Sequence, residues 1–448
     1  MSDEKIPCIG IRRETKTDLE RRAPLTPETV RSLIEKEGLE FRVEPSPSRV
    51  YTEDEYAAAG AKIQEGVADC DLIVGIKEIA PELIAPGKPQ LFFSHTIKGQ
   101  SYNMPLLARV LEARSTLIDY ERVMDGEGRR LIFFGVQAGQ AGMINTLWTL
   151  GRRLAAQGIE SPFAVLKQAR EYDSLDEAQD AVRAVGEAIR AGAMPAETTP
   201  LITGFAGYGN VGRGAQEIYD LLGGRELPPE ALASRVAGDD LDPMTAWKVV
   251  FREEDMVERA EGVSPFDLQE YYAYPDRFRS RFAGYLKDLT LLVNATYWDS
   301  RYPRWVTRED LEALFEAGGT PRLRVIGDVT CDPGGGIEST VKATMPDDPC
   351  YVYDYRDGSI TSGFEGEGMA VMAVDILPTE LPRESSMAFS AFLEPYIADV
   401  ARTDYGVEFN DLEMPEAFKR AVIAHRGELT PEYRYLAESL DEWRRTQG

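Results

Sequence analysis

Residues 200–222, PLITGFAGYGNVGRGAQEIYDLL, constrain the fold of this chain more than any other stretch. An apolar run predicts a buried strand, an amphipathic run predicts a helix, and glycines in GxGxxG spacing join the two. In such a corner the first glycine permits a tight turn, the second lets the backbone approach a pyrophosphate, and the third allows close helix packing. The helix N-terminus adds free N–H groups and partial positive charge. The stretch predicts a dinucleotide-binding corner, although a glycine-rich turn without a ligand has the same spacing. The residues expected at the cofactor are Gly207, Gly209, Asn210, Val211 and Gly212.

The acidic residue that often binds the adenosine ribose is not evident. About twenty residues after the glycines the chain reads GGRELPPEALASR, where no strand end is clear. Glu226 or Glu230 would favour NAD, whereas Arg225 or Arg235 could hold a 2′-phosphate. NAD versus NADP therefore stays open at this point.

Two later apolar runs, DLTLLVNATYW and LRVIGDVTCDPGGG, predict further strands of the same sheet. Ligands of parallel sheets lie at the carboxyl ends of the strands. We therefore expect Asn294, Tyr297, Asp328 and Asp332 beside the cofactor, with strand capping as the alternative role of Asp328. The polar and aromatic segment 226–285 reads as an insertion.

The first part of the chain also alternates strand and helix, from residue 6 to about residue 135. IPCIGI, EFRVEP, DLIVGI, LFFS and STLID predict strands, and PETVRSLIEKEG predicts a helix that ends at Gly38. A chain of 448 residues is longer than one core usually supports. We predict an α/β protein with two Rossmann-like, doubly wound parallel-sheet domains and an active-site cleft between them.

Composition excludes several classes of function. The formal net charge of −26 disfavours binding to nucleic acid or an anionic membrane, because this charge repels phosphate. The four cysteines show no CxxC pair, which suits reduced cytoplasmic thiols better than disulfides or a zinc site. No metal is expected. The N-terminus MSDEKIPCIG lacks the pattern of a signal peptide, and no apolar run is long enough to span a membrane. We expect an unprocessed cytoplasmic protein.

Ionisable residues follow the predicted strands of the first domain in unusual number. A charged residue at one strand end usually only marks where the chain reaches water, but several at one sheet edge, including the sole histidine of this half, indicate a site. These residues are Glu20, Arg21, Arg22, Lys77, Glu78, His95, Lys98, Tyr120 and Glu121.

Long motifs add a family resemblance. IGIRRETKTDLERRAPLTPETV, VGIKEI and FFSHTIKGQ resemble the N-terminal domain shared by alanine dehydrogenases, transhydrogenase subunits and lysine-forming saccharopine dehydrogenases. LIDYERVMDGEGRRLIFFGVQAGQAGMINTL, FDLQEYYAYPDRFRSRFAGYLKDLTLLVNATYWDSRYPRWVT and GFEGEGMAVMAVDILPTELPRESS resemble the lysine–2-oxoglutarate reductase half of bifunctional aminoadipic semialdehyde synthases. The resemblance extends to about residue 402.

The resemblance implies a domain plan and an activity. Residues 1–138 with 364–448 would form the substrate and catalytic domain, and residues 139–363 the dinucleotide domain. The chain would reductively condense L-lysine with 2-oxoglutarate to saccharopine, or catalyse the reverse, with NADP or NAD, NADPH being slightly favoured. It would be a free-standing reductase with a helical acidic tail, and a separate enzyme could oxidise its saccharopine. The oligomeric state stays open.

The resemblance also implies site residues. Lys77 and His95 match the family's acid–base pair: in the oxidative direction Lys77 would take the secondary-amine proton, and His95 would serve imine hydrolysis. A lysine can act in this way only if burial or a neighbouring cation lowers its pKa. A histidine satisfied in the core is the alternative for His95. His425, in AVIAHRGEL, is expected on the surface of a helix.

Substrate carboxylates call for arginine, because its planar fork matches them. Arg22 matches the family's carboxylate-binding arginine. The other residues expected to bind substrate are Glu78, Lys98, Gln100, Glu121 and Arg130; the two glutamates could hold the lysine ammonium, tune Lys77, or form structural ion pairs.

Two other functions remain open. An alanine-dehydrogenase-like enzyme would use ammonia in place of lysine and would share Arg22, Lys77 and His95. A non-catalytic nucleotide-binding subunit is the second alternative.

Overall fold

The computed structural model describes residues 6–262, 264–316 and 321–447, and the chain divides into two compact units. Residues 1–134 and 382–448 form the first unit, and residues 135–381 form the second. The second boundary lies later than the 364 expected from the sequence. The boundary differs because residues 369–372 form a strand of the second sheet. They begin the apolar run MAVMAV, and a run this short is consistent with a buried strand.

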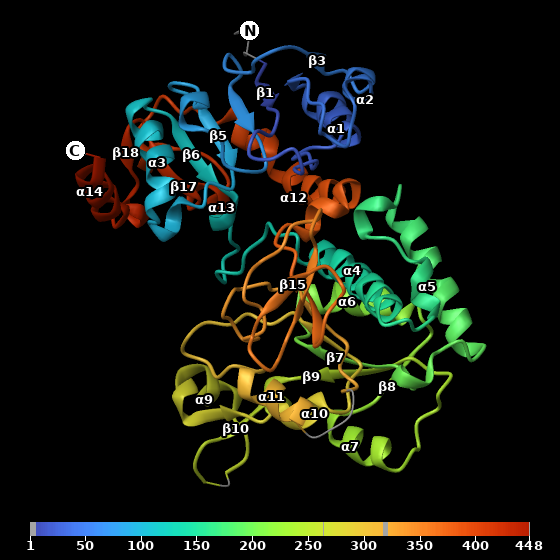
Figure 1. The fold of residues 1–448 in the computed structure, drawn as a ribbon. Helices are drawn as coiled ribbons and strands as arrows, with labels where there is room; N and C mark the ends of the chain where they lie inside the picture. Colours follow the sequence, from blue (N-terminus) through green and yellow to red (C-terminus); the bar gives the residue numbers. More distant parts are fainter. Residues whose placement is uncertain (1–5, 263, 317–320, 448) are drawn as a thin grey trace. The chain divides into compact units, whose positions relative to one another are not determined.

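The first unit is built on an eight-stranded sheet with the order β18-β17-β6-β5-β4-β1-β2-β3 (Figure 1). The six strands from the N-terminal part of the chain are parallel, and the two strands from the C-terminal part are antiparallel to their neighbours. The strands are β1 (Cys8–Ile11), β2 (Glu40–Val43), β3 (Lys62–Ile63), β4 (Leu72–Val74), β5 (Pro89–Phe92), β6 (Thr116–Asp119), β17 (Val422–His425) and β18 (Glu428–Leu429). This confirms the parallel α/β sheet that the alternating pattern predicts.

The helices of this unit begin and end where local chemistry dictates. The helix predicted from PETVRSLIEKEG is present as α1 (Pro27–Glu37): the Thr26 hydroxyl accepts from the Thr29 N–H, and Gly38 ends the helix at φ 67°. A left-handed residue at this position suits glycine because it has no Cβ. The other helices are α2 (Glu53–Ala58), α3 (Met104–Glu112), α12 (Pro382–Arg402), α13 (Glu416–Lys419) and α14 (Leu436–Gln447).

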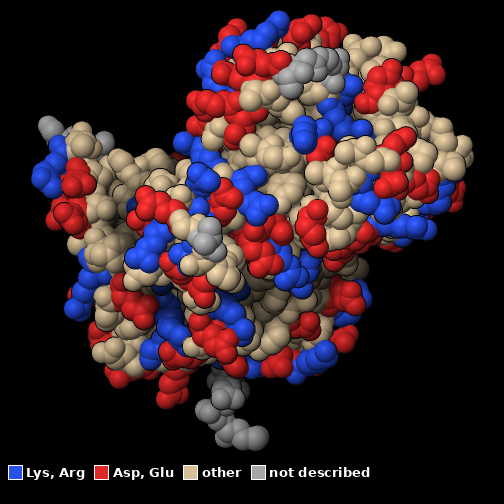
Figure 2. Space-filling model, turned by 90° about the horizontal axis from the view of Figure 1, so that it is seen from below, with Lys and Arg blue, Asp and Glu red and all other residues tan. Residues whose placement is uncertain are grey.

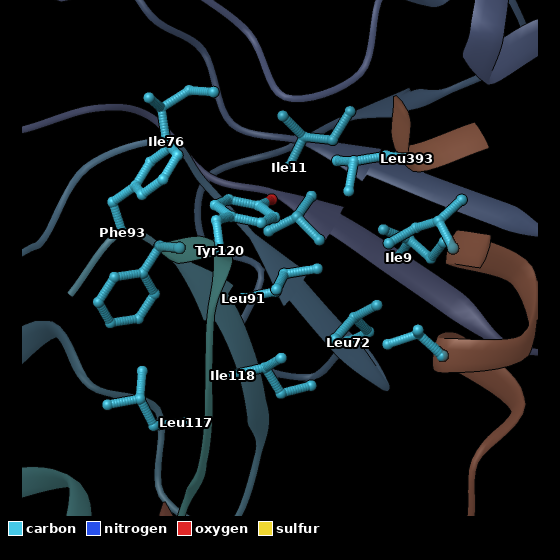
Figure 3. Close-up of a cluster of buried hydrophobic side chains, with 14 of the residues drawn as sticks. Ile9, Ile11, Leu72, Ile76, Leu91, Phe93, Leu117, Ile118, Tyr120 and Leu393 are labelled. Carbon is cyan, nitrogen blue, oxygen red and sulfur yellow. The ribbon is translucent and has the colours of Figure 1, made fainter. Parts of the chain in front are cut away.

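The core of the first unit lies between its sheet and helices, as the close-up in Figure 3 illustrates. Aliphatic residues of β1, β4, β5 and β6 pack there against Leu393 of α12. Ile9, Ile11 and Leu91 have no exposed surface. Tyr120, directly after β6, is equally buried and contacts the ring of Phe389 edge-on, with centroids 4.8 Å apart. The core therefore reaches the carboxyl ends of the strands and fixes the loops that follow them.

The C-terminal segment corrects two expectations. Instead of a purely helical tail, it supplies β17, which lies beside β6 although about 300 residues separate them in the chain (Figure 1). His425 is wrong as a surface helix residue: it ends β17 and is 4% exposed. Its Nδ1 lies 2.8 Å from the Thr116 hydroxyl and its Nε2 lies 2.9 Å from the Val407 carbonyl oxygen. Burial lowers the pKa of His425, which is satisfied in the core.

The second unit contains another eight-stranded sheet, ordered β15-β14-β16-β13-β12-β7-β9-β8. The strands from β16 to β8 run parallel, whereas β14 and β15 are antiparallel to their neighbours. The strands are β7 (Ile202–Ala206), β8 (Arg225–Glu226), β9 (Trp247–Phe251), β12 (Leu291–Asn294), β13 (Val325–Asp328), β14 (Cys350–Tyr353), β15 (Ile360–Ser362) and β16 (Met369–Met372), with β10 (Val257–Arg259) and β11 (Phe278–Ser280) forming a separate ribbon. Segment 226–285 is thus not only an insertion, because it contains β9, the neighbour of β7.

Two helices of this unit approach each other through glycine. They are α4 (Gly135–Ala156) and α6 (Asn210–Asp220), which follows the glycine corner. A Cβ on Gly139 would lie 2.0 Å from the Val211 carbonyl oxygen, and one on Gly214 would lie 2.1 Å from that of Val136. Only glycine permits this contact. The other helices are α5 (Leu175–Arg190), α7 (Pro229–Ala237), α8 (Glu253–Met256), α9 (Leu268–Ala273), α10 (Ala283–Leu286) and α11 (Arg308–Glu316).

Acidic and basic side chains are interspersed over the molecular face that Figure 2 shows. Among the described residues, no helix combines the length and apolar character needed to cross a membrane.

Candidate functional site

Four neighbouring strands of the first sheet end in loops that carry ionisable residues. In the order β6, β5, β4 and β1 these strands are adjacent and parallel, so their carboxyl ends share one edge. Glu121 follows β6, His95 follows β5, Lys77 and Glu78 follow β4, and Arg22 lies in the loop after β1. The structure brings these predicted site residues of the first unit together.

His95 lies between two carboxylates. Its Nε2 is 3.6 Å from Glu78 Oε2, and its Nδ1 is 3.6 Å from Glu121 Oε2. These distances exceed ordinary hydrogen bonds, so the interaction is electrostatic. The imidazole also stacks near the Phe93 ring, with the planes 12° apart, and 32% of its side chain is exposed. The ring is therefore accessible, and the two carboxylates would stabilise an imidazolium formed during proton transfer.

Backbone strain and a buried carboxylate fix the position of this histidine. His95 has φ 55°, a left-handed conformation uncommon for a non-glycine residue, and the Asn103 side-chain amide donates to its carbonyl oxygen at 2.9 Å. Asp119, at the end of β6, accepts hydrogen bonds from the hydroxyl and N–H of Ser94 and from the N–H of Glu121. One fully buried side chain thus orients both loops. Sequence analysis missed Asp119, although its place at a strand end in STLIDYE was the available signal.

Lys77 is half-buried, and charges of both signs lie around it. Burial, followed by the charge of the Arg22 guanidinium, lowers the pKa of Lys77 below its ordinary value. The direction of this shift is the one that a lysine acting as a base requires. Burial alone would raise the pKa of Glu20, but the Arg22 guanidinium holds it below its usual value. Glu20, 1% exposed, accepts from Arg22 Nε at 2.7 Å and from Nη2 at 2.5 Å.

The loop that bears Lys77 is clamped by two residues that the sequence did not single out. Glu14 accepts hydrogen bonds from the backbone N–H of Ile76 at 2.7 Å and of Lys77 at 2.9 Å. Arg12 donates to the Lys77 carbonyl oxygen and lies 3.4 Å from Glu14. Gly75 leaves the room that the Arg12 guanidinium occupies, since a Cβ there would lie 2.3 Å from its central carbon. Both clamp side chains are nearly buried and hold the backbone of this loop.

The remaining candidates of the first unit lie further out. Arg130 is exposed, stacks over Phe93 with its guanidinium carbon 5.3 Å from the ring centroid, and donates to the Ile132 carbonyl oxygen. The His95 imidazole, and also the charges of Arg130 and Lys98, hold the pKa of Glu121 below its usual value against the effect of burial. Gln100 is exposed and accepts from the Tyr102 hydroxyl. The structure thus brings Arg130 and Lys98 near the cluster electrostatically, whereas the contacts of Gln100 recorded among the described residues are local ones.

Each of the three glycines in the glycine corner of the second unit is needed for a different reason. Gly207 has φ 103°, and a Cβ there would lie 2.7 Å from the Ala295 carbonyl oxygen. A Cβ on Gly212 would lie 2.3 Å from the Gly207 carbonyl oxygen, so the turn closes on the helix. No atom lies within 4 Å of a Cβ built on Gly209, which leaves open space for a ligand. The corner fits a dinucleotide pyrophosphate at the N-terminus of α6.

A cavity of about 450 Å³ opens beside this corner. Aromatic side chains of segment 255–305 form much of its wall. Glu253, at the start of α8, accepts from the Tyr208 hydroxyl at 3.0 Å and from the Tyr272 hydroxyl at 2.8 Å. The lining comprises Gly207, Tyr208, Gly209, Glu253, Met256, Tyr271, Tyr272, Ala295, Thr296, Tyr297, Tyr302 and Trp305.

The strand next to β7 is not the one that the spacing suggested. Arg225 and Glu226 form the edge strand β8, and Glu230 and Arg235 lie on α7, whereas β9 is the strand next to β7. Arg252 and Glu253 follow β9 and are the residues that the fold places at the level of the glycine corner. The spacing rule failed because β8 and α7 separate α6 from β9.

The other cofactor candidates are engaged within the protein. Asn294 donates to Asp328 at 2.9 Å and accepts from the N–H and hydroxyl of Thr296. Asp328 also accepts from the Thr340 hydroxyl and from the Cys331 N–H. These two buried residues tie strand ends together, and burial raises the pKa of Asp328. Tyr297, 79% exposed, lines the cavity, and Asp332 is exposed.

Comparison with protein families matches residues 10–141 to the N-terminal domain, and residues 279–432 to the C-terminal domain, of the alanine dehydrogenase/PNT type. The chain is 37% identical to alpha-aminoadipic semialdehyde synthase of Arabidopsis thaliana over 445 residues, covering 96% of the chain and 41% of that protein. It is 30% identical to saccharopine dehydrogenase [NAD(+), L-lysine-forming] of Neurospora crassa over 400 residues, covering 86% of the chain and 89% of that protein. The chain thus spans less than half the length of the synthase.

Solved structures show the same fold at low identity. L-alanine dehydrogenase superposes with a TM-score of 0.63 at 17% identity, covering 97% of this chain and 99% of that one. Transhydrogenase from Sinorhizobium meliloti gives 0.53 at 16% identity, covering 95% of this chain and 99% of that one. These likenesses confirm an α/β fold with two Rossmann-like domains.

Proposed function

The chain belongs to the family of lysine-forming saccharopine dehydrogenases, and from this premise we propose that it reductively condenses L-lysine with 2-oxoglutarate to saccharopine, or catalyses the reverse. The reaction joins the lysine side-chain amine to the 2-oxo carbon, expels water to form an imine, and reduces that imine. A nicotinamide dinucleotide supplies or accepts the hydride. The first unit then holds the substrate and moves protons, while the second binds the cofactor.

The observation that carries this proposal is the half-buried Lys77, whose pKa is lowered, followed in the chain by Glu78, which with Glu121 flanks His95. Lys77 takes the proton of the secondary amine of saccharopine as the hydride leaves. His95 then serves the addition of water to the imine, or in the condensing direction the formation and dehydration of the carbinolamine. Glu78 and Glu121 stabilise positive charge on the imidazole or on the lysine ammonium.

Arg22 is the proposed partner of a substrate carboxylate. Its Nε and Nη2 are held by Glu20, and among the described residues its Nη1 makes no hydrogen bond. The guanidinium is stacked on the Phe134 ring, 4.2 Å from the centroid. The hydroxyls of Ser386 and Ser390 on α12 accept from the N–H groups of Ala23 and Thr26, which fixes the loop behind it. Arg130, which is exposed, is the proposed partner of a second substrate carboxylate. Lys98 and Gln100 remain weaker candidates for binding the substrate.

For the cofactor we favour NADP(H) over NAD(H). Phe251 pairs with Ala206, so Arg252 follows at the level of Gly207. The Arg252 guanidinium lies 5.4 Å from the Tyr208 ring, and no described carboxylate lies within 4.0 Å of it. Glu253, the residue that could bind a ribose hydroxyl, is already held by two tyrosines. An arginine at this place suits a 2′-phosphate.

The cofactor preference can be tested with an Arg252→Gln variant. Loss of about 1.5–3 kcal/mol from a charged hydrogen bond predicts a 10- to 100-fold rise in the KM for NADPH, with the KM for NADH unchanged. Arg225→Gln, on the edge strand β8, is the matched control and should change neither. An equal effect of Arg252→Gln on both cofactors would contradict the assignment.

The activity is tested by following oxidation of NADPH and NADH with 2-oxoglutarate and either L-lysine, ornithine, ammonia or no amine. The proposal requires turnover that depends on both L-lysine and 2-oxoglutarate. Turnover with ammonia would instead support the alanine-dehydrogenase-like alternative, and cofactor binding without any turnover would support a nucleotide-binding subunit. A separate saccharopine-oxidising enzyme as partner and a cytoplasmic location stay predictions; relatives from rat and cattle are named mitochondrial.

A further inference from the structure

Two of the four cysteines, far apart in the chain, meet in the first unit. Cys8 begins β1 and Cys70 lies in the turn before β4, and their sulfur atoms are 3.2 Å apart. Val67, Ile73 and Ala85 surround the pair with apolar side chains. The absence of a CxxC motif concealed this pair, because the two thiols meet only through the pairing of β1 with β4.

The backbone already holds the two residues in place. The Asp71 N–H donates to the Cys8 carbonyl oxygen at 2.8 Å, and the Cys8 N–H donates to the Asp71 carboxylate at 3.0 Å. The Cys70 N–H donates to the Val67 carbonyl oxygen at 3.0 Å. The sulfur atoms can therefore approach through side-chain movement without a change in strand pairing.

The two thiols are chemically unequal. Cys8 is 6% exposed, whereas Cys70 has no exposed surface. Contact with the Cys70 thiol and the charge of Arg42 lower the pKa of Cys8 against the effect of burial. Contact with Cys8, together with burial, raises the pKa of Cys70. Cys8, the more exposed of the two, is the thiol that an oxidant can reach, and the enclosed Cys70 is placed to resolve the product.

We infer that Cys8 and Cys70 form an oxidation site, at which a small two-electron oxidant such as hydrogen peroxide converts the dithiol to a disulfide. The Cys8 thiolate attacks one peroxide oxygen, the O–O bond breaks, and a sulfenic acid and one water form. The Cys70 thiol then attacks this sulfur, the S–O bond breaks, and a second water leaves. Two thiols and one hydrogen peroxide thus give one disulfide and two waters. Thiols reverse the bond by exchange.

The site lies at the amino ends of β1 and β4, whose carboxyl ends carry the Arg12–Glu14 clamp and Lys77. The disulfide would cross-link these two neighbouring strands. Because it closes a loop of about sixty residues, it should stabilise the folded unit mainly by restricting the unfolded chain. This inference is independent of the proposed reaction.

The test treats the folded, full-length chain with hydrogen peroxide, blocks remaining thiols under denaturing conditions and maps the peptides by mass spectrometry. The wild type should fall from four free thiols to two and yield a peptide pair linked through Cys8 and Cys70. Cys8→Ser should keep three thiols, whereas Cys70→Ser should lose the Cys8 thiol to an unresolved sulfenic acid and should form no linked pair. Cys350→Ser, in the second unit, is the matched control and should fall from three to one. The urea midpoint should rise on oxidation in the wild type and in this control only.

Two results would overturn the inference. One is a folded wild type that keeps four thiols after treatment while a small dithiol in the same tube is oxidised. The other is a linked pair that contains Cys331 or Cys350. Arg42→Gln provides a further check, because it leaves all thiols in place: oxidation should slow at neutral pH, and an unchanged rate would contradict the role given to the Cys8 thiolate.

Discussion

The two sheets of this protein present opposite chemistry at the carboxyl ends of their strands. The first sheet places Lys77, His95 and several carboxylates at these ends, and hydrogen bonds between neighbouring loops fix their positions. The second sheet places Gly207, Gly209 and an aromatic-walled cavity there. One edge is suited to moving protons, the other to letting a ligand approach the backbone. The same architecture therefore supports a division of labour that only the side chains determine.

Two buried glutamates, one in each unit, also differ in the charge of their neighbours. Glu20 in the first unit is 1% exposed and Glu380 in the second is 3% exposed. The Arg22 guanidinium keeps the pKa of Glu20 below its usual value although burial opposes this. Glu380, in contrast, meets only the Asn145 amide at 2.9 Å and the Arg170 N–H at 3.4 Å, and burial raises its pKa to about 7. A charged partner decides which form of a buried carboxyl the fold keeps.

The largest effect on activity is expected from replacing Lys77, at the carboxyl ends of the strands of the first sheet. Lys77→Met should lower kcat/KM by about 10²- to 10⁴-fold, because the general base is lost, while the affinity for the dinucleotide stays unchanged. Steady-state kinetics and a cofactor titration measure the two quantities. Lys62→Met, on the edge strand β3 of the same sheet, is the control and should leave turnover intact. Normal turnover of Lys77→Met would contradict the role of this lysine.

The buried carboxyl of the second unit should respond to pH in a defined direction. The pKa of Glu380, about 7 in the folded state, exceeds the ordinary value of 4.5, so the folded state binds the proton more readily. Its contribution to stability is complete below pH 4.5 and is lost as the pH rises through about 7. Glu380→Gln should therefore raise the free energy of unfolding at pH 8 by about 3 kcal/mol.

Urea unfolding at pH 5 and pH 8 measures this effect. The gain of Glu380→Gln over the wild type should be much smaller at pH 5. Glu187→Gln, exposed on α5, is the control and should behave alike at both pH values. A gain that does not depend on pH would mean that titration of Glu380 is not its cause.

Two alanine substitutions test the separate reasons given for Gly212 and Gly209 in the glycine corner. Gly212→Ala should destabilise the second unit by about 1–3 kcal/mol and abolish dinucleotide binding, because the new Cβ meets the Gly207 carbonyl oxygen. Gly209→Ala makes the same chemical change in open space. It should leave the free energy of unfolding unchanged and weaken only dinucleotide binding, as measured by fluorescence titration. Equal destabilisation by both would refute the separate reasons given for these glycines.

The smallest effect concerns the charge around Lys77. Lys16, 45% exposed and paired with Glu78, contributes to the lowered pKa of Lys77. Lys16→Met should raise that pKa, so the pH at which saccharopine oxidation becomes efficient should move upward. The rate rises with pH because the base must be deprotonated. Profiles of kcat/KM at low and high salt measure the shift, which salt should reduce; Lys36→Met on α1 should leave the profile in place.

The sequence predicted those features that local pattern specifies. The glycine corner, α1 with its end at Gly38, and the strands ahead of Lys77 and His95 all carry such signals, and the structure confirms these elements. The convergence of strand ends followed from the rule for parallel sheets. The roles of the individual site residues remain predictions that the experiments above address.

Features that depend on distant partners could not be predicted in this way. VIAH of β17 is too short to distinguish strand from helix, and it becomes a strand because β6 offers an edge to pair with. The Cys8–Cys70 pair and the Asp119 bridge likewise arise only when separate strands meet. The amino-acid sequence of one segment alone carries no information about its contacts with a distant segment.

The proposed chemistry is tested most directly by following the nitrogen atom. The protein is supplied with NADPH, 2-oxoglutarate and L-lysine labelled with ¹⁵N in its side chain, and the product is analysed by mass spectrometry. The account predicts saccharopine that retains the label, formed by the wild type and not by Lys77→Met. Glutamate formed when ammonia replaces the lysine, or no lysine-dependent product despite measurable cofactor binding, would contradict it.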